Sequence, residues 1–524
     1  MTSTDATVRE VGDLDPSPPP PPAPPRIGRG RALAFTVGVA ALCALVFWLA
    51  HESLVDDAYI TLAYARNVAV DLHWGLTPQQ VSNTATAPGN VLLLATVTAL
   101  TGLFGDARPV LALGIVCVLC GAAIGWGWAR VGHALRLPWW AGAAGAVLVV
   151  CNPFLVSALG LEVLPTAAVL MLLLTAAVEQ HRRYGPLAFG LLGGLAVLIR
   201  PDLVVFVGVL ALFTPAVLRK LYVAVPAALL VGAPWYLWSW FFFGSAVPDT
   251  FVIKTLQRSF DGVDFANGPF VMFADRPWLV LVSFAPAVLG AVLTLVCLLA
   301  LPLRLPRLRG TAAPIGLGVG AAVYYAVYCI LTVPPYHWYY VPPMIGLTTA
   351  GAVLAGRLAA RADGTPTRAV SLPFAGAAGV LVAATVALLG MQGAPWVTPP
   401  VFGNWAITPD YARAGVAIGE RVGDDVVRNP GEIGVLAYFC RCAMVNDFTD
   451  RGVIVPMVEQ RIARAGPVLG PLLRLNYRNL DRTRQPLQAR YELRYEPGPG
   501  VGPDVWPVWA PGRGDGHLRL VPLG

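Results

Sequence analysis

The feature that most constrains this chain is a series of apolar runs of about 20 residues, a length that can cross the ~30 Å hydrocarbon core of a bilayer. The first covers residues 32–50. Further runs predict spans at about 108–129, 138–157, 162–180, 185–199, 202–218, 221–243, 278–301, 311–333, 339–358 and 370–391. Of the 524 residues, 56% are hydrophobic and 13% are charged, and soluble domains have roughly twice that charged fraction. We therefore predict an all-α polytopic membrane protein with about eleven transmembrane helices plus interfacial helices.

The basic residues predict how the chain is oriented. The formal net charge is +7, but the arginines gather in short loops on one side of the predicted spans, beginning with Arg26, Arg29 and Arg31. Cytoplasmic loops carry such an excess, so topology explains these clusters and we expect no nucleic-acid partner. The short run 90–104 fits this bias only as an interfacial or re-entrant helix. If it crossed the membrane, every later loop would lie on the opposite side.

This topology divides the chain into three parts. Residues 1–31 hold a proline run and predict a disordered cytoplasmic tail, residues 32–391 form the transmembrane domain, and residues 392–524 lie outside the cell membrane. The last part is richer in charged residues and contains short β-like runs at 434–439 and 443–445, which predict a soluble α/β domain. Its Cys440 and Cys442 are one residue apart, a spacing that is awkward for a mutual disulfide.

A pair of acidic residues, Asp56 and Asp57, follows the first predicted span directly. Adjacent carboxylates raise each other's pKa, so the pair could supply a general base near neutral pH or a metal ligand. A solvated helix start is the alternative, because Asp favours the first helical turn. Residues 57–70 then have helical spacing and predict a helix that lies in the membrane interface.

Lys254 is unusual because the chain has only one other lysine, Lys220, which lies in a predicted cytoplasmic loop. Lys254 lies outside, against the positive-inside bias. A compact ammonium there suits a lipid-linked phosphate, and snorkelling toward lipid headgroups is the alternative.

Other polar residues fall on the same side. Glu162, at the mouth of a span, is either a helix-start residue or a pocket residue. Arg200 and Asp202 interrupt an apolar run, which favours a structural ion pair. His73 lies in a polar loop and either binds a ligand or faces solvent, whereas His337 lies in the aromatic segment 334–343 and either donates to a phosphate or belongs to an interfacial aromatic belt.

In their order along the chain, these segments resemble the GT-C superfamily of glycosyltransferases, and within it the branch of the terminal arabinofuranosyltransferase of arabinogalactan assembly. The resemblance covers roughly residues 32–450. It is carried by 56–61 with Tyr64 and Asn67, by 86–88, 160–162, 200–202, 248–251 with Lys254, 338–342, and 431–434 with Asp447.

The resemblance implies an inverting enzyme of GT-C type. Such enzymes take a sugar, here first of all arabinofuranose, from a polyprenyl monophosphate donor in the outer leaflet and pass it to a cell-envelope glycan or a protein. It implies that Asp56 is the base and Asp57 its neighbour, an order that the residues alone do not settle. Lys254, with His337, would stabilise the leaving phosphate. Some members use a divalent cation, for which Asp57 is a candidate ligand. Further substrate-binding candidates are Glu162, His73, Tyr59 and Arg200.

Two other functions remain open. One is a protein or lipid mannosyltransferase of the same superfamily. The other is a lipid-linked sugar transporter or flippase, which would be expected to carry ionisable residues near the bilayer midplane or paired discontinuous helices. The conspicuous charges of this chain lie at one face, which favours the enzyme, and the intact acidic pair argues against an inactive glycan-binding homologue.

Overall fold

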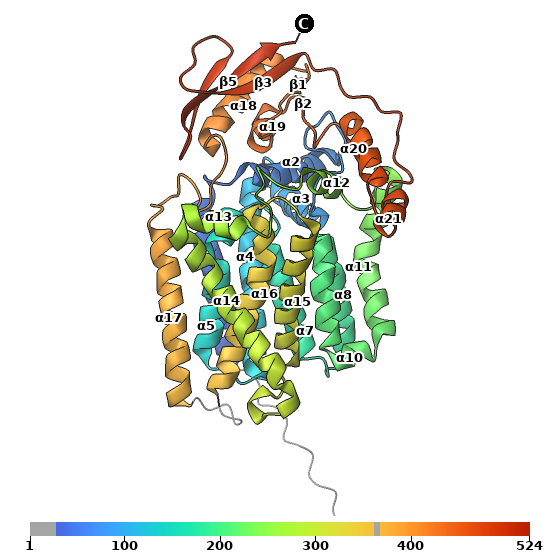
Figure 1. Cartoon of the computed structure of the whole chain (residues 1–524). Coiled ribbons are helices and arrows are strands. Elements are labelled where there is room, and N and C mark those ends of the chain that lie inside the picture. Colours follow the sequence, from blue (N-terminus) through green and yellow to red (C-terminus); the bar gives the residue numbers. More distant parts are fainter. Residues whose placement is uncertain (1–27, 361–366, 524) are drawn as a thin grey trace, which may run out of the picture.

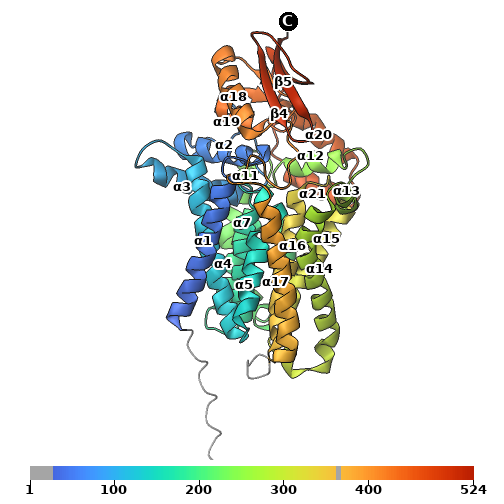
Figure 2. The same ribbon diagram turned by 90° about the vertical axis from the view of Figure 1, so that its left-hand side faces the viewer.

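The computed structural model describes residues 28–360 and 367–523 as a bundle of helices with a smaller domain on one end (Figure 1). The N-terminal end of α1 and the C-terminal domain lie at opposite ends of the bundle in both views (Figures 1 and 2). The predicted tail, 1–31, falls mainly outside the described residues, and helix α1 already begins at Arg29.

Among the described residues, seven helical segments are long and apolar enough to cross a membrane. Six of them hold one long helix each, and the seventh joins α5 to α6. They are α1 (Arg29–Ala50), α4 (Pro109–Ala134), α5 (Trp139–Val150) with α6 (Pro153–Ser157), α11 (Leu221–Phe242), α14 (Pro277–Ala300) with the 3₁₀ turn η2 (Leu301–Leu303), α15 (Ala312–Leu331) and α17 (Arg368–Gly390).

The other predicted spans are also helical, but they are shorter or more polar. Helix α16 begins with a polar aromatic segment that contains a histidine, which lowers its hydropathy. The predicted count of eleven is therefore not confirmed, although the polytopic helical architecture is. These helices are α7 (Val163–Val178), α8 (Gly185–Ile199), α9 (Val204–Leu212) after the turn η1 (Pro201–Leu203), and α16 (His337–Ala359).

Shorter helices collect where the bundle meets the C-terminal domain (Figures 1 and 2). The interfacial helix expected at 57–70 is present as α2 (Asp56–Asp71), and the short run 90–104 is α3 (Pro88–Gly102). Two more, α12 (Thr250–Gln257) and α13 (Gly268–Asp275), lie at the same end. The one-turn helices α10 (Pro215–Leu218) and η3 (Pro306–Leu308) belong to the remaining connections.

The C-terminal domain contains a five-stranded mixed sheet with strand order β2-β1-β3-β5-β4. Strand β1 is parallel to β2 and β3, whereas β5 is antiparallel to β3 and β4. The predicted α/β character is thus confirmed. The elements are α18 (Thr408–Val422), β1 (Val427–Arg428), α19 (Gly434–Cys440), β2 (Met444–Val445), α20 (Arg451–Ala463), α21 (Leu469–Asn476), β3 (Tyr491–Pro497), β4 (Val505–Ala510) and β5 (Gly514–Pro522).

Two local features of this domain differ from what the sequence suggested. Residues 434–439 form helix α19 and not a strand, because an apolar run this short fits either structure and only tertiary contacts decide between them. Cys440 and Cys442 form a disulfide with a Cα–Cα distance of 5.1 Å. The left-handed conformation of Arg441, with φ of 55°, brings them closer than two extended residues would lie.

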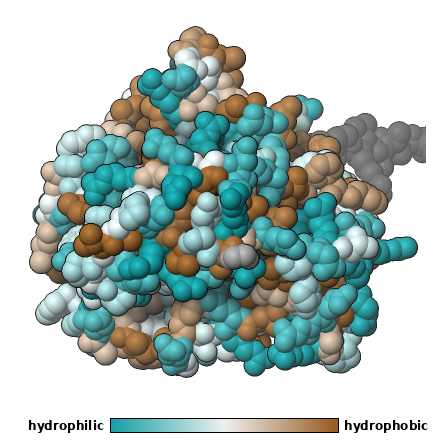
Figure 3. All heavy atoms as spheres, turned by 90° about the horizontal axis from the view of Figure 1, so that it is seen from above, coloured by the Kyte–Doolittle hydropathy of each residue, from teal (hydrophilic) through white to brown (hydrophobic). Residues whose placement is uncertain are grey.

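Seen from the C-terminal domain, the surface is mostly hydrophilic, with scattered apolar residues (Figure 3). Lipid-facing helices show the opposite pattern, because α1, α11 and α17 leave more than four fifths of their most apolar windows unburied. This contrast fits a domain in water on a bundle in lipid.

Close packing of α8 against α11 depends on two glycines. A Cβ atom would lie 2.2 Å from the Ala224 carbonyl oxygen at Gly190, and 2.3 Å from the Ala228 carbonyl oxygen at Gly194. Small residues spaced in this way allow helices in membranes to approach at backbone distance.

We expect Gly194→Ala to destabilise the bundle by about 1–3 kcal/mol, the usual cost of overpacking. Thermal unfolding in detergent would measure the effect. Gly208→Ala in α9 is the matched control, because nothing lies within 4 Å of the position that its Cβ would take, and there the better helix propensity of Ala should leave stability unchanged or raised. Equal unfolding temperatures for both variants would contradict the packing role.

Candidate active site

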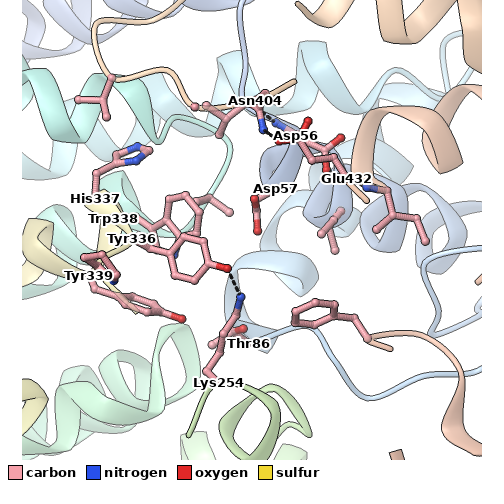
Figure 4. Close-up of a pocket in the computed structure, with 18 of the residues that line it drawn as sticks. Asp56, Asp57, Thr86, Lys254, Tyr336, His337, Trp338, Tyr339, Asn404 and Glu432 are labelled. Atoms are coloured by element: carbon pink, nitrogen blue, oxygen red, sulfur yellow. Dashed lines mark hydrogen bonds between the residues drawn. The ribbon is translucent and has the colours of Figure 1, made fainter. Parts of the chain in front are cut away.

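A cavity of about 760 Å³ lies between the end of the bundle and the C-terminal domain, within the range of small-molecule sites. Figure 4 shows part of its lining. The wall combines segments far apart in the sequence: 55–61, 84–87, Thr250–Gln257, 335–339, 401–405 and 430–433 contribute to it. Of the candidates from the sequence, it brings together Asp56, Asp57, Glu162, Lys254 and His337.

The Asp56 carboxylate is bound by the backbone of the C-terminal domain. Its Oδ2 accepts from the N–H groups of Ile433 (3.1 Å) and Gly434 (2.8 Å), and its Oδ1 accepts from that of Val435 (2.8 Å). Burial raises the pKa of Asp56, with the charges of Glu432 and Asp57 adding to the rise, while these N–H bonds oppose it. Asp56 therefore joins helix α2 to the start of α19.

Asp57 is the free member of the pair. Among the described residues, none donates a side-chain hydrogen bond or forms an ion pair with its carboxylate, which points toward Tyr336 and Lys254 (Figure 4). Burial raises the pKa of Asp57, and the ammonium of Lys254 partly offsets that rise. A half-buried carboxylate with a raised pKa and no hydrogen bond from another side chain can accept a proton.

Glu432, from the C-terminal domain, lines the cavity close to Asp56. Its Oε1 accepts from Asn404 Nδ2 (2.8 Å), and its Oε2 accepts from the Trp405 N–H (2.9 Å) and Tyr411 Oη (2.8 Å). Asn404 Oδ1 in turn accepts from the Asp56 N–H (3.2 Å). Burial raises the pKa of Glu432. Because both of its oxygens are occupied, Glu432 holds neighbouring groups in place.

Lys254 projects into the cavity from α12. Its Nζ donates to Tyr336 Oη (2.7 Å) and lies 4.7 Å from the centre of the Phe448 ring. Within the described ranges it forms no ion pair with a carboxylate. Burial lowers the pKa of Lys254 to about 8, and the charge of Asp57 opposes that decrease. A partly desolvated cation with free donor capacity can bind an anion.

His337 lies at the first position of α16, and its side chain reaches the cavity wall. Its Nε2 atom is buried and has no hydrogen-bond partner among the described residues. A buried polar atom without a partner is costly, so a ligand that occupies this part of the cavity would gain by bonding to it.

Arg200 lies behind the cavity in a buried ionic network. It is 1% exposed, and its Nη1 donates to Glu162 Oε1 (2.6 Å) while its Nε donates to Asp202 Oδ1 (2.9 Å). Tyr324 and Tyr328 donate to Asp202 as well. Glu162 reaches the cavity, but its charge is already paired, so this network supports the wall.

Tyr59 and His73 are not among the described residues that line the cavity. Tyr59 packs edge-on against Tyr438 with 5.2 Å between ring centres. His73 Nε2 bonds to the carbonyl oxygens of Thr77 (3.1 Å) and Gln80 (2.9 Å). Both side chains stabilise the structure around α2.

Three lining residues were not assigned from the sequence. Glu432 lies in the segment 431–434 and Tyr336 in the aromatic segment. The sequence singled out both segments, but it indicated no role for either residue. No sequence pattern pointed to Asn404, because it belongs to an irregular connection that only tertiary contacts bring to Asp56.

The cavity does not fit a divalent cation. No group of three or more His, Cys, Asp or Glu side chains that could hold a metal occurs in 28–360 or 367–523. The oxygens of Asp56 face N–H donors, which would repel a cation, and Asp57 alone is a poor ligand set for Mg²⁺ or Ca²⁺.

Solved structures share this fold. ArnT from Cupriavidus metallidurans bound to undecaprenyl phosphate matches with a TM-score of 0.54 at 16% identity, over 94% of this chain and 98% of that one. Arabinofuranosyltransferase AftD from Mycobacteria matches with 0.51 at 14% identity, over 88% of this chain and 35% of that one. The Archaeoglobus fulgidus oligosaccharyltransferase, tethered with an acceptor peptide, matches with 0.50 at 13% identity, over 88% and 69%.

These likenesses concern the fold. The polytopic helical architecture predicted from the sequence is the one that these three proteins share. No protein-family model and no curated protein sequence matches the chain.

We expect Gly434→Ala to loosen the C-terminal domain from α2, because its Cβ would lie 1.9 Å from the Asp56 carbonyl oxygen. The cost should be about 1–3 kcal/mol, as for other overpacked sites, and hydrogen exchange of the 433–435 amides should accelerate. Gly466→Ala in the same domain has open space around its Cβ and should leave that exchange unchanged. Unaltered exchange in Gly434→Ala would show that the contact is dispensable.

Proposed function

We propose that the protein is an integral membrane glycosyltransferase that moves a sugar from a polyprenyl monophosphate donor to a hydroxyl group of an acceptor, with inversion. The observation that carries the proposal is the pair of unpaired charges in one cavity, the carboxylate of Asp57 and the ammonium of Lys254. A proton acceptor and an anion-binding group that face the same space are what an inverting transfer from a phosphate requires.

In this proposal Asp57 is the general base, in place of the Asp56 that the family resemblance favours. The lone pairs of Asp56 that face α19 already accept three N–H groups, so protonation there would break the contact between the two domains. Asp57 has no such contact and can take a proton without structural change. Asp56 is then a positioning residue that fixes the first turn of α2.

At the anomeric carbon the reaction forms one bond and breaks another. Asp57 accepts the proton of the acceptor hydroxyl, whose oxygen attacks the anomeric carbon from the side opposite the phosphate. The bond from that carbon to the phosphate oxygen breaks, and its electron pair leaves with polyprenyl phosphate. The negative charge of the phosphate grows in the transition state, where Lys254 would stabilise it most.

Tyr336 would position the cation. Its hydroxyl accepts from Lys254 Nζ and its ring stacks on Trp338 with 4.6 Å between ring centres, so the phenol has little freedom to move. The unpartnered Nε2 of His337 is available to a second polar group of the substrates.

The fold neighbours and the site support the choice of substrates. ArnT has been solved with undecaprenyl phosphate, which supports a polyprenyl phosphate donor, and AftD is an arabinofuranosyltransferase, which keeps arabinofuranose as the first sugar to test. We propose a cell-envelope glycan as acceptor. The cavity would face the extracytoplasmic side, because Arg29 and Arg31 lie at the opposite end of the bundle (Figure 2).

The test is incubation of the purified protein in nanodiscs with a panel of radiolabelled polyprenyl-phosphate sugars and glycan acceptors. Transfer of arabinose supports the proposal in full, and transfer of mannose to a lipid or protein supports the mannosyltransferase alternative. In sealed vesicles, labelled lipid that changes leaflet without any transfer would identify a flippase and overturn the enzymatic assignment.

We expect Asp57→Asn to lower kcat by about 10²–10⁴-fold, the usual contribution of a general base, with unchanged hydrogen exchange at 433–435. Asp56→Asn should instead accelerate that exchange, because an amide NH₂ group faces backbone donors, and should impair both kcat and KM. Near-normal turnover in Asp57→Asn, together with loss of turnover in Asp56→Asn at unchanged exchange, would make Asp56 the base.

We expect kcat/KM to fall above about pH 8, because the ammonium of Lys254 is present below its lowered pKa of about 8 and is lost above it. Arginine stays protonated in proteins, so Lys254→Arg should move this limb to higher pH even if the maximum rate drops. Lys220→Arg, at the other lysine, should leave the limb in place. If kcat/KM of Lys254→Arg falls at the same pH as that of the wild type, then Lys254 is not the group whose deprotonation causes the fall.

A further inference from the structure

Helix α21 of the C-terminal domain is apolar on two faces. Leu473 is buried against α12 and α20, in a small core with Val252, Ile253 and Val458. On the other side Val468, Leu472 and Leu475 are 76%, 58% and 54% exposed. Leu472 and Leu475 lie three residues apart on one face of the helix. Val468 is the N-cap residue, four positions before Leu472, and Pro471, which precedes Leu472 in the chain, is also exposed.

This exposed face continues the surface of a membrane-crossing helix. Trp240, near the end of α11, donates from Nε1 to the Leu475 carbonyl oxygen (3.0 Å), and the Trp240 carbonyl oxygen accepts from Asn479 Nδ2 (3.2 Å). Beside it, Phe241 and Phe242 are 71% and 61% exposed. Tryptophan with an apolar ring and a bonded N–H is typical of the membrane–water interface.

The height of α21 along the bundle agrees with a position at the membrane–water interface. In Figures 1 and 2 it lies beside the end of α11, below the sheet of the C-terminal domain and close to the level of α13. Helix α13 likewise exposes apolar side chains, with Phe270 74% and Phe273 48% exposed. Both short helices therefore lie where the apolar part of the bundle ends.

Two exposed arginines lie at the C-terminal end of α21. Arg474 belongs to the last turn of the helix, and Arg478 to the turn that follows it. Interfacial helices commonly combine an apolar face with Lys or Arg at its edge, where the cation meets the headgroup phosphates.

We propose that α21 is a membrane-interface helix that inserts Val468, Leu472 and Leu475 into the outer part of the bilayer, with Arg474 and Arg478 at the phosphate level. The occupant of this face is thus lipid. Because α21 and α20 form one core with α12, this contact would also fix the height of Lys254 above the bilayer. The placement of the helix does not depend on the reaction proposed above.

The experiment places a fluorophore on the exposed face of the full-length chain. In a Cys329→Ala background, which removes the free cysteine that is not buried, Leu472→Cys and Leu475→Cys are labelled separately with a nitrobenzoxadiazole dye. Each protein is reconstituted as a single copy in nanodiscs of phosphatidylcholine and phosphatidylglycerol, with ordinary or brominated acyl chains. Val501→Cys is the control, because Val501 is a 95% exposed aliphatic residue in the distal loop of the same domain.

Brominated lipid should quench the dye about twofold or more at 472 and 475, since interfacial helices bury their apolar face ~5–10 Å deep, and should not quench it at 501. Equal emission in both lipids at 472 and 475 would overturn the proposal. Absence of quenching in the labelled proteins, together with disulfide cross-linking of two copies of the unlabelled Leu472→Cys variant in vesicles, would assign the face to a second copy and would also overturn the proposal. If one variant fails to fold, the other carries the same test.

Discussion

The structure depends on one buried carboxylate that is shared between two parts of the chain. Asp56 belongs to α2, at the end of the bundle, but its hydrogen bonds come from Ile433, Gly434 and Val435 of the C-terminal domain. An ionised carboxylate is costly to bury unless its lone pairs are satisfied, and here three backbone donors satisfy them. Only glycine fits at 434. The same contact brings Asn404 and Glu432 over the cavity, so the site exists only where the two parts meet.

The charged groups around the cavity are of two kinds, those with direct ion-pair partners and those without. Arg200 is surrounded by Glu162, Asp202 and two tyrosines, so each charged group in that network has hydrogen-bonded partners inside the protein. Asp57 and Lys254 are also desolvated, and although each charge favours the other, the two groups form no direct ion pair. Desolvating a charge without such a contact lowers stability, and polar or charged groups of the substrates would supply the missing contacts. This difference separates the supporting network from the groups proposed to act on substrates.

Much of the fold could be predicted from the sequence, because long apolar runs and the distribution of arginines are one-dimensional signals. Helix α2, the short α3 and the co-location of Asp57 with Lys254 follow from topology. The role of Asp56 could not, because its partners are backbone N–H groups 377 to 379 residues away, which leave no mark on side-chain composition. The run 434–439 was ambiguous for the same reason, and the disulfide of Cys440 depends on one left-handed residue, Arg441.

The distance along the chain between Asp56 and Gly434 has a consequence for biosynthesis. Helix α2 emerges from the ribosome early, whereas its partner amides are made 378 residues later. Contacts of such long range form late, after the intervening chain has been ordered. The wall of the cavity is therefore incomplete until the C-terminal domain has been synthesised and has packed against α2, because 401–405 and 430–433 contribute to that wall. A nascent chain that ends before these segments has α2 but lacks the enclosed cavity.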